Sequence, residues 1–120
     1  MQSYSGDSVL NTAQMDEGIE RDVGVLSVLA YNQILVQRFE DAFALYELLR
    51  QINPSEVKWL GGSAYCCLRL GRWREAEALL RTLDEHKLTS QESRILSRLR
   101  LEVAFFAESE NTITQTQGEA

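Results

Sequence analysis

Apolar residues recur at helical spacing through the middle of the chain and predict four consecutive helices. These helices are expected over residues 21–36, 40–52, 56–70 and 73–86. At the start of the second helix and along it, Phe39, Ala42, Leu45 and Leu49 follow one another at intervals of three or four residues, as one face of a helix requires. The pattern therefore predicts an all-α protein.

The pattern occurs twice, at an offset of 34 residues. A comparison of residues 26–49 with residues 60–83 gives eight identities. The matches are Leu26 with Leu60, Ala30 with Ala64, Tyr31 with Tyr65, Arg38 with Arg72, Ala42 with Ala76, Ala44 with Ala78, Leu45 with Leu79 and Leu49 with Leu83. A period of this length is typical of stacked helical hairpins, since one hairpin alone cannot bury its apolar face.

Turn residues separate the predicted helices. Gly71 stands in the turn of the second hairpin, where a glycine adopts a left-handed backbone easily. Gln37 holds the matching position in the first hairpin, so we expect that turn to be strained or shaped differently. Pro54 ends the first unit because it cannot continue a helix, and Ser55 is expected to cap the next one.

A further helix is predicted over residues 90–108, after the second unit. Thr89 and Glu92 have the spacing of a capping box, in which each side chain satisfies a backbone amide of the other. Arg94 and Arg98 stand where a third repeat needs apolar and small residues, so we expect a terminal helix that seals the stack. Its predicted buried side consists of Ile95, Leu96, Leu99, Val103 and Phe106.

Composition divides the chain into three segments. Residues 1–20 are expected to be a flexible N-terminal segment, residues 21–108 a helical repeat domain, and residues 109–120 a disordered tail. The longest apolar stretch, residues 23–31, is far shorter than the roughly 20 residues that a membrane span needs, and no secretion signal is visible. These features predict a cytoplasmic protein that does not insert into membranes.

The repeated positions resemble the tetratricopeptide repeat (TPR) over residues 23–88. A small residue lies in the first helix of each unit, and an aromatic residue opens the second helix, followed three positions later by another small residue. The positions are Ala30 and Ala64, Phe39 and Trp73, and Ala42 and Ala76, with Pro54 closing the first unit. The resemblance implies antiparallel helical hairpins stacked as about two TPR units plus a C-terminal capping helix. Small residues suit this packing because helix axes only 8–10 Å apart leave little room.

Charge narrows the classes of partner. The net charge of −6 argues against binding to nucleic acid. The distribution is uneven: residues 69–100 carry eight basic and five acidic side chains, or +3, whereas residues 1–68 carry four basic and nine acidic ones, or −5. Any electrostatic attraction is therefore expected to be local.

No catalytic, metal or cofactor site is predicted. The chain has one histidine, His86, so a general base with a positioned partner is not apparent. Cys66 and Cys67 are adjacent, and neighbours on a helix point about 100° apart, which suits neither joint metal binding nor a disulfide. We expect both cysteines to be small packing residues, and the chain not to be an enzyme.

A partner-binding groove is expected on the first helix of each unit. Extrapolation of the repeat places eight residues on this surface, namely Ser27, Tyr31, Ile34, Leu35, Gly61, Tyr65, Leu68 and Arg69. These apolar and aromatic side chains suit an amphipathic helix or an extended hydrophobic segment. They differ from the Lys and Asn residues with which some TPR adaptors clamp a terminal carboxylate. In the alternative interpretation, the C-terminal helix fills this surface as core.

The chain is similar to the small TPR chaperones of bacterial type III secretion systems. This resemblance implies a non-enzymatic chaperone that masks a hydrophobic segment of a secretion substrate or component in the groove. The alternative is a TPR scaffold or adaptor that joins folded protein partners. With the client absent, we expect the uncovered groove to let two copies of the chain associate.

Overall fold

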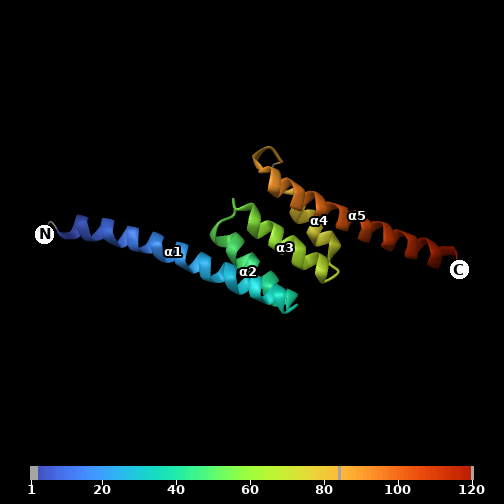
Figure 1. Ribbon diagram of the computed structural model, residues 1–120, viewed down its shortest axis with the longest axis horizontal. Coiled ribbons are helices and arrows are strands. Elements are labelled where there is room, and N and C mark those ends of the chain that lie inside the picture. The colour runs from blue at the N-terminus through green and yellow to red at the C-terminus, as the bar shows by residue number, and fades with distance from the viewer. Residues whose placement is uncertain (1–2, 84, 120) are drawn as a thin grey trace.

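The computed structural model describes residues 3–83 and 85–119, which form α-helices and one short 3-10 helix but no strand (Figure 1). The elements are α1 (Ser3–Leu35), α2 (Phe39–Ile52), α3 (Val57–Arg69), α4 (Trp73–Arg81), the 3-10 helix η1 (Glu85–Lys87) and α5 (Ser90–Glu119). The prediction of an all-α protein with two stacked hairpins and a C-terminal helix is confirmed.

The helices stack in the order in which they follow one another. α1 packs against α2, α2 against α3, and α3 against α4, while α5 contacts both α3 and α4. Figure 1 shows α1 and α5 on opposite sides of this stack, each running well beyond it toward its own terminus. Because α5 covers the second hairpin, it occupies the place that the first helix of a third hairpin would take.

Small residues stand at the helix contacts, as the repeat predicts. Ala30, Ala42, Ala64 and Ala76 have no exposed surface at all. Ala30 and Ala42 belong to a buried cluster between α1, α2 and α3, whereas Ala64 and Ala76 belong to a second cluster shared by α3, α4 and α5. The two clusters meet at α3, which therefore forms the centre of the fold.

Both hairpin turns have the same left-handed geometry. Gln37 has a φ of 63° and Gly71 a φ of 78°. Gln37 donates its N–H to the Ile34 carbonyl (3.0 Å) and Arg38 donates to the Gln33 carbonyl (2.8 Å), which is the Schellman pattern. Gly71 and the residue after it repeat these bonds at 3.2 Å and 2.8 Å. The first turn is thus strained, as expected, but it is not shaped differently.

The connection between the hairpins differs from the predicted one. Glu56, rather than Ser55, is the N-cap of α3, and its carboxylate accepts a hydrogen bond from the Lys58 amide at 3.4 Å. Ser55 donates its hydroxyl to the Asn53 side chain instead (2.9 Å), so this hydroxyl does not reach the amides of α3.

The capping box at the start of α5 is confirmed. The Glu92 amide donates to the Thr89 hydroxyl at 3.1 Å, and the Thr89 amide donates to the Glu92 carboxylate at 2.9 Å. This reciprocal pair fixes where α5 begins and thereby its direction across the second hairpin.

Helix lengths differ most from the sequence expectations at the two ends. α1 begins at Ser3 rather than at residue 21, and α5 continues to Glu119 rather than to residue 108. Neither extension contains a proline, and a helix already nucleated by packing gains one backbone hydrogen bond for each residue it adds. Residues 1, 2 and 120 of the predicted flexible segments lie outside the described residues. The division into segment, domain and tail stays a prediction.

α4 is shorter than predicted and ends at Arg81 instead of residue 86. The Thr82 hydroxyl donates to the Leu79 carbonyl at 2.7 Å and helps to close the last turn. Beyond it, Leu83 and Leu88 pack against the core of the second hairpin. Both side chains reach this core from irregular backbone. A continued helix would direct them away from the core.

Candidate binding groove

A groove of about 600 Å³ lies between α1, α3 and the beginning of α5. Its walls come from parts of the chain that the stacking of the hairpins brings together, with α3 in the middle. The lining residues are Tyr31, Ile34, Tyr46, Val57, Lys58, Gly61, Gly62, Tyr65, Gln91, Glu92, Ile95 and Leu96. Most of this surface is apolar or aromatic, so the groove suits an apolar occupant better than a charged one.

Four of the eight residues predicted for the groove line it in the structure. They are Tyr31, Ile34, Gly61 and Tyr65. Tyr31 and Tyr65 occupy matching positions of the two units, and the stacking of the units brings both onto one surface. Their role in binding a partner stays a prediction.

The other four predicted residues lie outside this lining. Leu68 is buried in the core, because it follows Ala64 by one helical turn and shares its face toward α4 and α5. Arg69 turns toward α5, where its guanidinium pairs with the Glu102 carboxylate. Ser27 is half-buried on α1, and Leu35 is exposed near its end.

The two tyrosines have different surroundings. The Tyr65 ring meets the edge of Phe39 at 6.2 Å between centroids, and the Arg69 guanidinium lies 5.3 Å from its centre. These contacts hold the ring in place against the stack. Tyr31 remains 57% exposed. The groove therefore has one fixed aromatic wall and one aromatic side chain that is open to a partner.

Tyr46 and Gly62 form a part of the groove that the sequence analysis did not identify. A Cβ atom on Gly62 would lie only 2.6 Å from the Tyr46 ring, whereas a Cβ on Gly61 would meet nothing within 4 Å. Gly62 thus lets the ring pack directly on α3, and Gly61 leaves open space beside it. The paired glycines inside a predicted helix were the available signal.

The start of α5 forms the third wall. Leu96, Leu99 and Val103 are buried as predicted, and Phe106 packs against them. Ile95 was predicted to join this buried side but is 53% exposed and lines the groove. Its neighbour Leu96 faces the core, and adjacent residues on a helix point about 100° apart. The C-terminal helix therefore borders the groove and leaves it open.

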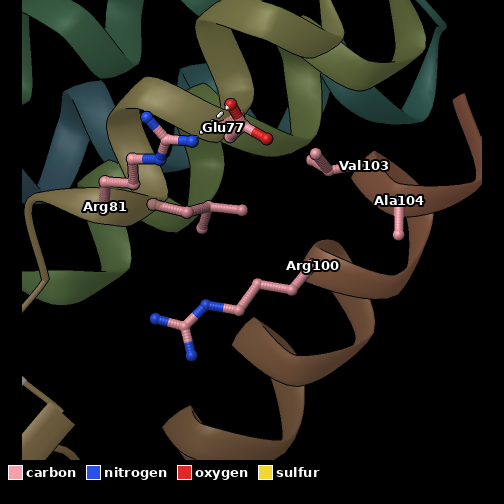
Figure 2. A pocket seen from close by; sticks show the side chains of 6 residues that line it. Glu77, Arg81, Arg100, Val103 and Ala104 are labelled. Carbon is pink, nitrogen blue, oxygen red and sulfur yellow. Dashed lines mark ion pairs between the residues drawn. The ribbon is translucent and has the colours of Figure 1, made fainter. Parts of the chain in front are cut away.

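A second hollow, of about 270 Å³, lies between α4 and α5 (Figure 2). Glu77 and Arg81 of α4 form an ion pair at 3.0 Å on one side, while Arg100, Val103 and Ala104 approach from α5. The set contains no nucleophile and no second carboxylate. It provides no combination of acid, base and nucleophile for catalysis.

Both cysteines are free thiols buried in the core. Burial raises the pKa of the Cys66 thiol to about 12, with a smaller contribution from Cys67. Burial, and secondly the carboxylate of Glu75, raises the pKa of Cys67 to about 11. Because the thiolate is the reactive form, both side chains are poor nucleophiles near neutral pH.

Among the residues that the structure describes, no three His, Cys, Asp or Glu side chains lie close enough together to hold a metal ion. His86 lies in η1 and not at the end of α4 as predicted. Over the same residues, no helix combines the length and hydropathy needed to cross a membrane.

Comparison with known proteins identifies the family. A family model described as Tetratricopeptide repeat matches residues 34–99, which is more than half of the chain. No curated protein and no solved structure matches the chain. Repeats of this kind are typically protein-interaction modules without catalytic activity. With its two stacked hairpins, alanine contacts and open groove, the chain belongs to the tetratricopeptide repeat family.

Proposed function

We propose that this protein binds an apolar segment of another protein in the groove between α1, α3 and α5 and masks that segment from water. The observation that supports this most directly is the groove itself, whose exposed Tyr31 and Ile95 stand on opposite walls with Gly61 between them. An amphipathic helix laid along Gly61 would contact both walls. No chemical step is part of this function.

The finer proposal is that the protein is a chaperone of type III secretion, and that its client is a secretion substrate or component. This step rests on the resemblance described from the sequence. In this role, the groove keeps an aggregation-prone segment of the client covered until export. Affinity comes from apolar burial, at about 25 cal/mol per Å², less the free energy of ordering the client.

The test replaces both groove tyrosines. The variant Tyr31→Ala/Tyr65→Ala should lose most of its affinity for a 20-residue amphipathic helical peptide, by a factor of about 10³ if each aromatic side chain contributes ~2 kcal/mol. The control variant Leu48→Ala/Ile52→Ala removes two exposed apolar side chains of α2 that do not line the groove. Calorimetric titration measures affinity, and circular dichroism checks the fold. Unchanged affinity in the folded tyrosine variant would move the site elsewhere.

The same groove is proposed to mediate self-association when no client is bound. Sedimentation velocity should then show dimers of the wild-type chain that an added peptide dissociates. A monomer at all concentrations would contradict this part of the proposal and leave the binding role untouched.

A second candidate function is that of a scaffold between folded partners. It is favoured by the outer face of α1, where Val25, Val28 and Leu29 are exposed at helical spacing, and by Val36, which is exposed directly after the helix ends. Together with buried Ala30 and half-buried Leu26 and Ile34, these residues make this stretch of α1 apolar on nearly all sides. If Val25→Ser/Val36→Ser removes a native partner that the tyrosine variant retains, the scaffold function is preferred.

A further inference from the structure

The groove continues along α5 beyond the part that the proposed function uses. Two further hollows, of about 720 Å³ and 350 Å³, lie on α5. The first shares Ile95 with the groove, and the second shares Arg98 and Leu101 with the first. Arg69, one turn after the groove residue Tyr65, lines the last hollow. Through these shared residues the three hollows form one trough that follows α5, and α3 borders it only at its two ends.

The chemistry of this trough changes along its length. Around Tyr31 and Ile34 its walls are apolar, whereas its α5 end carries Arg94 and Arg98. Glu102 already neutralises the charge of Arg69. No carboxylate of the described residues pairs with Arg94 or Arg98, and both are exposed. The α5 end is therefore positively charged.

Apolar side chains lie beside these two arginines. Leu101 is 72% exposed and Phe105 is 67% exposed, which are the largest values among the described large apolar residues. The Phe105 ring meets the edge of Phe106 at 6.1 Å, and Phe106 packs on the core. Phe105 is thus held by the ring of Phe106 and presents an ordered aromatic surface to a partner.

We infer that the trough takes an amphipathic helix whose apolar face is flanked by acidic residues. Arg94 and Arg98 lie one helical turn apart, about 5–6 Å between Cβ atoms, which matches two carboxylates one turn apart on the partner helix. The apolar face of the partner lies along Leu101 and Phe105, which are one helical turn apart on α5. This inference rests on the proposed function and specifies the chemistry of its client.

The experiment uses three designed 20-residue helical peptides with the same leucine face, flanked by Glu, Gln or Lys. The wild-type chain should bind the Glu peptide about tenfold more tightly than the Lys peptide at low salt, a difference of about 1.4 kcal/mol that two exposed ion pairs together can supply. High salt should reduce this preference. The variant Arg94→Glu/Arg98→Glu should reverse it.

A matched control keeps the change in net charge the same. Arg21→Glu/Lys87→Glu reverses the charges of two exposed residues that line neither the groove nor the two further hollows on α5. The peptide preference of this variant should equal that of the wild type. Equal binding of all three peptides, or the same response in both charge variants, would overturn the inference.

The outcomes separate this inference from the proposed function. If the Gln peptide binds and its binding depends on Tyr31 and Tyr65, while charge has no influence, the groove function stands and the acidic client is refuted. If no peptide binds, both fail. If the chain forms a dimer that Arg94→Glu/Arg98→Glu dissociates without any peptide, a second copy is the occupant and the acidic client is again refuted.

Discussion

The two hairpins have the same backbone arrangement, but their side chains differ in burial. α3 has seven buried residues, whereas the described part of its counterpart α1 has only Ala30 buried. Leu35 is 61% exposed at the position where α3 has Arg69, which is paired to α5. The cause is the number of neighbours: α3 packs extensively on α2, α4 and α5, whereas the described part of α1 packs mainly on α2.

This difference shows that the place of a helix in the stack decides how buried each matched position of the repeat is. Val28 of α1 is 60% exposed, and the matching residue of α3 is Gly62, on which the Tyr46 ring lies. Asn32 is exposed, and its counterpart Cys66 is fully buried. Substitutions at matched positions can therefore separate the effect of the neighbours from that of the repeat.

The largest expected difference concerns a buried charge. Ala76→Glu places an unpaired carboxylate between α3, α4 and α5 and should reduce the free energy of unfolding by about 3–5 kcal/mol. Ala42→Glu should be less damaging, because α1 is held on one side only and can move away. Thermal and urea melts followed by circular dichroism measure both.

Matched controls for these charges exist within the same helices. Ala44 and Ala78 are also repeated, but both are exposed, so Ala44→Glu and Ala78→Glu should change stability by less than about 0.5 kcal/mol. Equal melts for the buried and exposed substitutions would show that the register of the hairpins is wrong.

Thiol reactivity compares Cys66 with its counterpart Asn32. In an Asn32→Cys variant, the new exposed thiol should react with a thiol-specific reagent about 10³-fold faster than the buried pair, which becomes accessible only through opening of the core. Mass spectrometry distinguishes the single fast modification from the two slow ones. Rapid labelling of Cys66 in the wild type would mean that α3 is less protected than its burial indicates.

The same thiols predict how stability depends on pH. Their native pKa values, about 12 for Cys66 and about 11 for Cys67, lie above the 9.0 of a free thiol. Between these values the unfolded state has lost thiol protons that the native state still holds, so the free energy of unfolding should fall as pH rises from about 9 toward 11. A Cys67→Ala variant should show a shallower fall in urea melts over this range.

Much of the fold could be predicted because the repeat contains local signals for its helix contacts, turns and helix ends. The alanine contacts, the left-handed turn residues and the Thr89–Glu92 capping box are local features, and local hydrogen bonding or sterics decide them. The helix ends were harder to predict. Ser55 was expected to cap α3, but it bonds to Asn53 and Glu56 is the cap, and a choice between two neighbouring polar residues is not visible in a hydrophobic pattern.

The candidate site was predicted less completely. Tyr31 and Tyr65 could be placed by the repeat, because matching positions of stacked units share a surface. Leu68 was misplaced because α5 covers the face of α3 on which it lies, and the repeat itself contains no α5. The contribution of Ile95 likewise depends on how α5 crosses the second hairpin, which is a tertiary property.

A smaller effect is expected where Tyr46 crosses α3. Gly62→Ala brings a methyl group to 2.6 Å from the buried Tyr46 ring, so the ring must shift, and we expect a loss of about 1–3 kcal/mol of stability. Gly61→Ala is the control, because it meets nothing within 4 Å and alanine favours the helix by up to ~1 kcal/mol. Urea melts of both variants should move in opposite directions. A stabilised Gly62→Ala would show that α2 and α3 adjust to each other freely.

The smallest effect concerns the two turns, which have the same hydrogen bonds but different residues. Gln37 adopts a φ of 63°, a region that costs a residue with a Cβ roughly 1–2 kcal/mol, whereas Gly71 adopts 78° without that cost. Gln37→Gly should therefore raise the free energy of unfolding by about 0.5–1 kcal/mol, since the added freedom of glycine in the unfolded chain offsets part of the gain. Gly71→Gln should lower it by a similar amount or more. Urea melts of the two variants and of the double exchange measure the effects, which should nearly cancel in the double exchange because the turns lie in separate hairpins. If Gln37→Gly is destabilising instead, the Gln37 side chain contributes more to the first hairpin than its left-handed backbone costs.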